Sequence, residues 1–155
     1  MKTFLTLLLA LGLCQITLSA QETSDWRTIK HAGTRFAAVD VLVDAGTPGL
    51  AAYQLTFRAR RGDVKIVGIE GGAHPAFKNP PFYDPKAMQH EKVVLAAFNT
   101  ATPEKLPHGW VRVATVHVQI SGSKEPEYAA KLEAAADSEG RPIPAKVNIE
   151  ERKKP

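Results

Sequence analysis

Residues 51–60 read Ala-Ala-Tyr-Gln-Leu-Thr-Phe-Arg-Ala-Arg and have the clearest periodicity in the sequence. Apolar residues stand at every odd-numbered position, while the even-numbered positions are mostly polar. An alternation with a period of two puts one set of side chains on a core and the other in water, as in a half-buried antiparallel strand. The predicted core-facing side chains are Tyr53, Leu55 and Phe57, and the predicted outward ones are Gln54, Thr56 and Arg58.

Other runs with strand character lie on both sides of this stretch. In the run at 36–44, valines share one face, and Asp40 and Asp44 on the other face are predicted to be solvent residues. Further runs, rich in β-branched residues, lie at 64–69, 92–99, 110–121 and 143–149. Segments with Gly and Pro separate the runs, as turns do.

The segment 127–136 has the composition of a helix but the period of a strand. Its alanines, Leu132 and charged residues favour a helix by intrinsic propensity. Tyr128 and Leu132, however, belong to an apolar face that alternates with Lys131 and Glu133. We predict a strand here, with helix as the alternative, followed by a turn at 137–140 in which Gly140 takes a positive φ.

These elements together predict an all-β chain. The fold expected is an antiparallel β-sandwich of jelly-roll or immunoglobulin-like type, with about seven to nine strands and one long Pro-rich loop. The chain has 155 residues, 44% of them hydrophobic, and a formal net charge of +4. This length suits one domain, and this balance excludes a disordered polyelectrolyte.

The N-terminus predicts export. Lys2 precedes a ten-residue apolar run at 4–13, which is too short to span a membrane, and small residues precede a predicted cleavage site after Ala20. The chain is therefore expected to be secreted or periplasmic, without a transmembrane anchor. The single cysteine, Cys14, lies in this predicted signal peptide and follows Leu13, which does not suit a lipidation site. The mature chain is then free of disulfides.

The rest of the chain divides into three predicted parts. Residues 21–34 form a lead-in, residues 35–150 form the sandwich domain, and residues 151–155 form a basic tail. Arg58 and Arg60 on the outward face of 51–60 are explained by edge protection and solubility, with contact to an anionic polymer as the alternative. A nucleic-acid partner is not expected, because the net charge is mild and export is predicted.

The segment 71–91 has four prolines and no usable period. Such a loop in a small domain is functional or a packed surface cover. We predict that it packs across one end of the sandwich and exposes at least one of its aromatic residues. Aromatic faces suit sugar rings and protein hot spots alike. The candidate binding residues are therefore Phe77, Phe82 and Tyr83 from the loop, together with Trp110 at the start of a strand.

Signals for catalysis are weak. The five histidines show no metal-binding spacing, there is no G-x-S-x-G motif, and the mature chain has no cysteine nucleophile. We therefore predict no catalytic residue, no metal site and no cofactor. The alternative is a small secreted enzyme with its site in the 71–91 loop.

The order of signals resembles that of cohesin-like domains, which share a β-sandwich superfamily with several carbohydrate-binding modules. The resemblance is carried by Val-Asp-Ala-Gly at 43–46, Gly-Leu-Ala-Ala-Tyr-Gln-Leu-Thr-Phe at 49–57, Val-Lys-Ile-Val-Gly-Ile-Glu-Gly-Gly at 64–72, Leu-Pro-His-Gly at 106–109 and Asp-Ser-Glu-Gly at 137–140. It spans about residues 35–150 and implies a sandwich fold. The segment 58–63 departs from it, because such domains usually carry an aromatic-Asp-Pro turn there.

The functional prediction is a secreted, non-catalytic module that binds an extracellular protein partner or a polysaccharide. The alternative within binding proteins is a stand-alone carbohydrate-binding module that uses Trp110, Phe82 and Tyr83. The sequence leaves the oligomeric state open.

Overall fold

The computed structural model describes residues 33–152. The predicted signal peptide, with Cys14 and the cleavage site, most of the predicted lead-in and residues 153–155 lie outside the described residues. The strands are β1 (Arg35–Asp44), β2 (Ala52–Arg61), β3 (Asp63–Gly71), β4 (Lys92–Phe98), β5 (Trp110–Ser121), β6 (Glu127–Ala136) and β7 (Lys146–Glu151). Three single-turn 3-10 helices lie at Pro75–Phe77, Pro85–Ala87 and Pro103–Lys105.

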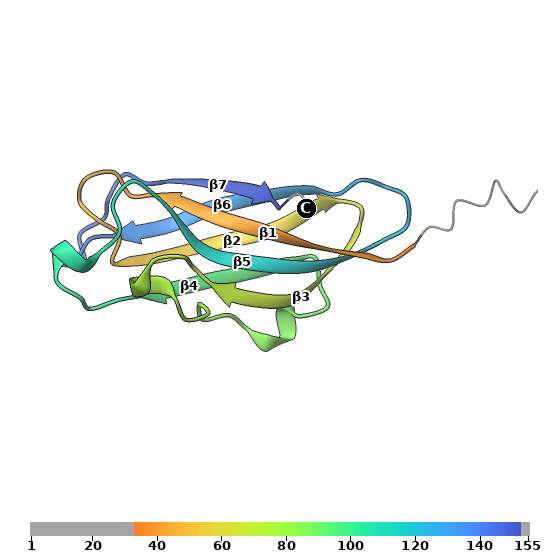
Figure 1. Cartoon of the computed structure of the whole chain (residues 1–155), viewed down its shortest axis with the longest axis horizontal. Coiled ribbons are helices and arrows are strands. Elements are labelled where there is room, and N and C mark those ends of the chain that lie inside the picture. Colours follow the sequence, from red (N-terminus) through yellow and green to blue (C-terminus); the bar gives the residue numbers. More distant parts are fainter. Residues whose placement is uncertain (1–32, 153–155) are drawn as a thin grey trace, which may run out of the picture. The chain divides into compact units, whose positions relative to one another are not determined.

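The seven strands form two antiparallel sheets (Figure 1). The four-stranded sheet has the order β3-β5-β1-β7, and the three-stranded sheet has the order β4-β2-β6. Every strand pairing is antiparallel. The prediction of an all-β antiparallel sandwich is therefore confirmed, with a strand number inside the predicted range.

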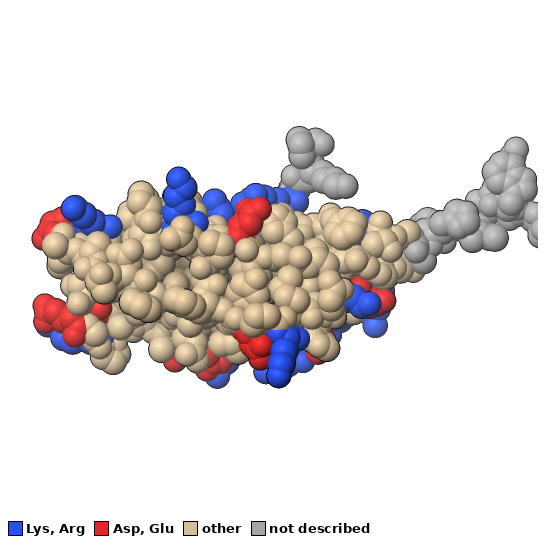
Figure 2. Space-filling model, turned by 90° about the horizontal axis from the view of Figure 1, so that it is seen from below, with Lys and Arg blue, Asp and Glu red and all other residues tan. Residues whose placement is uncertain are grey.

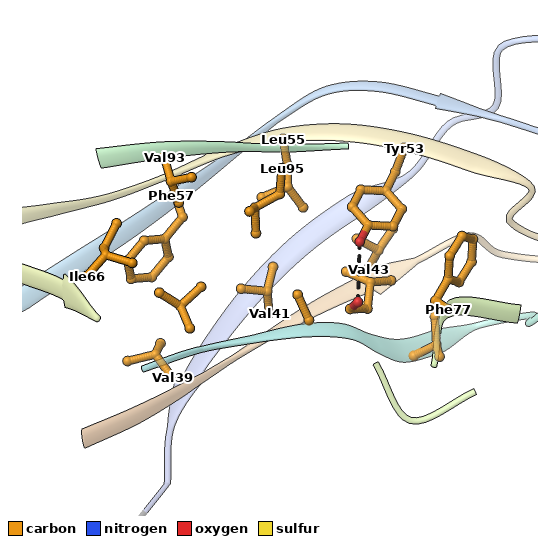
Figure 3. Close-up of a cluster of buried hydrophobic side chains, with 14 of the residues drawn as sticks. Val39, Val41, Val43, Tyr53, Leu55, Phe57, Ile66, Phe77, Val93 and Leu95 are labelled. Atoms are coloured by element: carbon orange, nitrogen blue, oxygen red, sulfur yellow. Dashed lines mark hydrogen bonds between the residues drawn. The ribbon is translucent and has the colours of Figure 1, made fainter. Parts of the chain in front are cut away.

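The core lies between the sheets and follows the predicted alternation (Figure 3). Tyr53, Leu55 and Phe57 of β2 are buried, whereas Gln54 and Arg58 are exposed. From the facing sheet, the valines Val39, Val41 and Val43 of β1 point into the core, together with buried residues of β3 and β5. Alternating side chains that point to opposite sides of a pleated strand produce this division.

One polar group reaches into the core near the loop side. The Tyr53 hydroxyl donates a hydrogen bond of 3.2 Å to the Val113 carbonyl oxygen, which Figure 3 marks as a dashed line. Burial raises the pKa of Tyr53 far above its usual value, so the phenol stays neutral and remains a donor. The bond joins β2 of one sheet to β5 of the other.

The predicted strand at 127–136 is confirmed, and the helix alternative is wrong. This segment is β6, and it pairs with β2 along its whole length. Its aromatic residue Tyr128 stacks on Phe57 with ring centroids 5.7 Å apart. Packing of the alternating face therefore outweighs the helix propensity of the alanines.

The turn after β6 is also confirmed. Gly140 has a φ of +76°, and the Asp137 carboxylate accepts hydrogen bonds from the backbone N–H groups of Glu139 and Arg141. These backbone bonds, together with the Arg141 guanidinium, hold the pKa of Asp137 below its usual value. The side chain thus caps the turn as an Asx residue does.

The C-terminal strand differs from the prediction. Residues 143–149 were expected to be a strand, but β7 runs from Lys146 to Glu151. The backbone N–H of Ile143 instead donates to the Ala135 carbonyl oxygen of β6. Pro144 follows, and it has no N–H to donate to a neighbouring strand. β7 then pairs with β1.

The first two residues of the predicted basic tail contact the sandwich. Glu151 belongs to β7, and the backbone N–H of Arg152 donates to the Ala38 carbonyl at 2.9 Å. The Arg152 side chain is bound by Asp40, so residues 151 and 152 belong to the folded domain. Among residues 33–152, no helix is long and apolar enough to cross a membrane.

Candidate functional site

The loop that joins β3 to β4 is pinned to the sandwich at its start. The Ala73 N–H donates to the Arg112 carbonyl oxygen at 2.9 Å. Side chains at Gly71 and Gly72 would overlap the backbones of Lys78 and Arg112, so the close approach requires glycine at both positions. Only glycine lets the loop turn back against its own strand here.

Phe77 fastens this part of the loop to the core. It is buried, and its ring meets the Tyr53 ring edge-on with centroids 5.3 Å apart (Figure 3). Phe77 was a predicted binding residue, but a buried side chain has no face to offer a ligand. Its role is that of an aromatic plug that closes the core under the loop.

The rest of the loop runs along one side of the sandwich. The predicted position across one end is therefore wrong. β3 and β4 are edge strands of the two sheets, and the loop pairs with both. The Gln89 N–H donates to the Ile66 carbonyl at 2.8 Å, and the Phe82 N–H donates to the Ala96 carbonyl at 2.7 Å. Proline has no N–H to donate to a neighbouring strand. A segment with four prolines can therefore pair only at the edge of a sheet.

Figure 2 shows the molecule from this side. Charged side chains stand mainly along the margins of the view, while the middle is largely uncharged. The predicted exposed aromatic of the loop is Phe82, at 69% exposure. Tyr83 is partly buried against the core, and it is less available than predicted.

Trp110 lies apart from the loop aromatics. It is exposed, but it opens β5 in the four-stranded sheet, opposite Asp44 of β1. Phe82, by contrast, pairs with β4 of the three-stranded sheet. The four predicted binding residues therefore do not form one surface.

A partner for Phe82 comes from β4 instead. Phe98 is 65% exposed, and its ring stacks on Phe82 with centroids 6.2 Å apart and planes 12° apart. Val94 on the same face of β4 is also exposed. We call Phe82, Phe98 and Val94 the aromatic edge. A shallow hollow beside it is lined by Asn79, Pro80 and Asn99 among others.

Strand parity in the sequence marks Phe98, although it is not among the predicted binding residues. In β4, Val93 and Leu95 face the core, so the even-numbered residues 92–98 face outward. Phe98 and Val94 thus stand on the outward parity of a strand, where water usually selects polar side chains. A large apolar residue at such a position marks a candidate contact surface.

A second hollow lies on the outer face of the three-stranded sheet. We call its cationic residues Arg58, Arg60, Lys92 and Lys131 the basic groove. Thr56, Ala129, Ala130 and Glu133 complete its lining. Lys131 pairs with Glu133 at 2.7 Å, and this hydrogen bond lowers the pKa of Glu133. The other three cations form no salt bridge with any residue of 33–152.

The outer face of the four-stranded sheet carries a different polar cluster. Asp40 was predicted to be a solvent residue, but its side chain is only 18% exposed. Its carboxylate accepts hydrogen bonds from Arg152 at 2.8 Å and from the Thr115 hydroxyl at 2.6 Å. Thr115, in turn, accepts a bond of 2.8 Å from Arg112. Burial alone would raise the pKa of Asp40, but these hydrogen bonds and both arginine charges hold it below its usual value.

The side chains of His74, His108 and His117 make separate local contacts. His74 Nδ1 accepts from the Ala76 N–H, and His108 Nδ1 lies 2.8 Å from the Thr47 carbonyl. His117 Nε2 lies 2.9 Å from Glu70 Oε1, a contact at ion-pair distance without hydrogen-bond geometry. Within residues 33–152, no three His, Cys, Asp or Glu side chains gather as metal ligands do. Comparisons with protein-family models, curated proteins and solved structures give no match to this chain.

Proposed function

We propose that this chain is a non-catalytic binding module that recognises an extracellular polysaccharide through the aromatic edge. The observation that carries the proposal is the stacked pair of Phe82 and Phe98, both about two-thirds exposed. Burying such a side chain contributes roughly 1.5–3 kcal/mol. A ligand that covers both rings therefore gains a large hydrophobic contribution to its free energy of binding.

The pair is held ready for contact. Phe98 ends β4, and Phe82 is fixed to Ala96 by two backbone hydrogen bonds of 2.7 and 3.0 Å. Pro80 and Pro81 restrict the chain just before Phe82. A recognition surface whose side chains and backbone are already ordered loses less conformational entropy on binding.

Polar groups beside the rings suit a sugar. Asn79 lies in the same hollow, is exposed, and makes no side-chain hydrogen bond to the described residues. Its amide can both donate to and accept from hydroxyl groups. An apolar ring face with a neighbouring amide matches a sugar, which has apolar C–H faces and polar hydroxyl edges.

A protein partner is the second candidate. The apolar cluster of Phe82, Phe98 and Val94 also has the chemistry of a protein hot spot, where aromatic residues at the centre of a patch dominate affinity. The amide-lined hollow favours the polysaccharide, and the experiment below separates the two.

The test is binding of the full chain to a glycan array, in parallel with capture of extracellular proteins. Phe82→Ala and Phe98→Ala should each weaken glycan binding by about tenfold or more, as loss of a stacked aromatic does. Phe36→Ala is the matched control, because Phe36 is equally exposed but lies on β1 of the other sheet. Equal losses in all three variants, or none in the first two, would overturn the assignment. Capture of proteins but no glycan, abolished by Phe82→Ala, would establish the protein partner instead.

A further inference from the structure

The basic groove and the aromatic edge lie on one continuous face. The strand register sets Arg58 opposite Lys92, Thr56 opposite Val94, and Ala52 opposite Phe98. Residues opposite one another in an antiparallel pair point to the same side of the sheet. The seven residues from Lys92 to Phe98 are separated by six steps of roughly 3.3 Å, so they span about 20 Å. A polymer lying along β4 would meet cations at one end and aromatic rings at the other.

The charge of the groove is local. Residues 33–152 contain fifteen Lys and Arg against fourteen Asp and Glu, so the folded domain is nearly neutral as a whole. Four of those cations line one hollow, where Glu133 is the only carboxylate. A general excess of basic residues therefore does not explain the groove.

The arrangement of these cations also opposes stability. Arg58 and Lys92 stand directly opposite on neighbouring strands, and like charges in that position are destabilising. Solubility is served equally well by cations spread over the surface. A cluster that costs stability and has one carboxylate for four cations has the properties of a binding site for anions.

We propose that the polysaccharide bound by this face is anionic and that its carboxylate or sulfate groups occupy the basic groove. This inference rests on the proposed function and names the class of ligand. Arg58 and Arg60 offer forked donors that match such oxyanions, and Lys92 adds a point charge. Ala129 in the lining is small, so a chain can lie close to the sheet. Neutral sugar faces then reach Phe98 and Phe82 further along β4.

The position of the groove disfavours an acidic peptide added as a strand. Strand addition needs a free sheet edge. Beyond β4, Phe82 already occupies backbone partners of Ala96, and the groove lies on the face of the sheet and not at its edge. Acidic peptides and nucleic acids remain as comparison ligands in the test.

The experiment measures binding of the full chain to polygalacturonate, heparin, a neutral glucan, polyglutamate and duplex DNA. The test variant carries Arg58→Gln, Arg60→Gln and Lys92→Gln. The matched control carries Lys65→Gln, Lys105→Gln and Lys146→Gln, which remove equal charge from exposed positions outside the groove. Thermal unfolding checks that both variants are folded.

Polygalacturonate or heparin should bind more tightly than the neutral glucan. The groove variant should lose about tenfold or more in affinity while the control stays near wild type, and raising salt from 50 to 200 mM should weaken wild-type binding by about tenfold. If the groove variant keeps its affinity while Phe82→Ala loses it, the anionic class is wrong and the aromatic site stands. If polyglutamate or DNA binds as well as the polysaccharides, the class assignment is overturned. If no polysaccharide binds, both proposals fail.

Discussion

On the outer face of the four-stranded sheet, Asp40 is matched to two arginines, whereas on the outer face of the three-stranded sheet three of the four cations of the basic groove form no salt bridge with the described residues. Asp40 holds Arg152 and Thr115, with Arg112 alongside, and most of its surface is covered. The basic groove, by contrast, has one carboxylate for four cations. The same folded domain thus satisfies the Asp40 cluster on one face and leaves Arg58, Arg60 and Lys92 without a salt bridge to the described residues on the other.

The exposed aromatic residues sharpen this contrast. Phe36 and Trp110 stand singly on the four-stranded sheet, but Phe82, Phe98 and Val94 gather on the three-stranded one. Isolated apolar side chains on a surface are ordinary, while a cluster marks a contact surface. We therefore propose that the first face serves stability and the second serves binding. Substitutions in the two faces, and in the core that they share, test this division.

The largest effect is expected in the core. Phe57 is fully buried and stacks on Tyr128, so Phe57→Ala should lower the free energy of unfolding by about 3–5 kcal/mol. Urea unfolding followed by circular dichroism measures this loss. A loss below about 1 kcal/mol would mean that this side of β2 is not the core on which both outer faces depend.

The next effect tests the matched face. Asp40→Ala leaves Arg152, Arg112 and Thr115 without their shared acceptor, and it should lower the free energy of unfolding by about 2–3 kcal/mol. Asp63→Ala is the control, because Asp63 is an exposed carboxylate that forms no salt bridge within residues 33–152. It should stay within about 0.5 kcal/mol of wild type. Equal losses in the two variants would remove the distinction between matched and unmatched charges.

The sequence predicted the core of both sheets and the outward position of Arg58 and Arg60, but not the side-chain contacts on either outer face. Alternation is a local pattern, so Tyr53, Leu55 and Phe57 could be assigned from ten residues. Asp40, Thr115 and Arg152 meet across 75 and 112 residues of chain, and no local pattern records such a meeting. The stacking of Phe82 on Phe98 likewise depends on how a loop without periodicity folds back onto β4. Parity could still have flagged Phe98, because strand alternation fixes its face.

Asp40 on the matched face should also contribute to the pH dependence of the free energy of unfolding. The pKa of Asp40 is lower in the folded chain than the ordinary value of 3.8, so the unfolded chain binds protons more readily as the pH falls. The stabilising contribution is present above pH 3.8 and is lost as the pH falls through the lower folded-state pKa. Between pH 5 and about pH 2, the free energy of unfolding should fall less steeply for Asp40→Asn than for wild type. Parallel curves would show that Asp40 does not carry this dependence.

The smallest effect, and the one with opposite sign, is expected on the unmatched face. Lys92 stands opposite Arg58, so Lys92→Gln removes a repulsion between like charges and should raise the free energy of unfolding by about 0.2–0.5 kcal/mol at low salt. The gain should fade at about 1 M salt, where exposed charges are screened beyond roughly 3 Å. Lys146→Gln on β7 is the control and should show no such gain, because Lys146 pairs across the ladder with Asp44. If Lys92→Gln lowers stability instead, the cations of the groove support the fold, and the contrast between the two faces disappears.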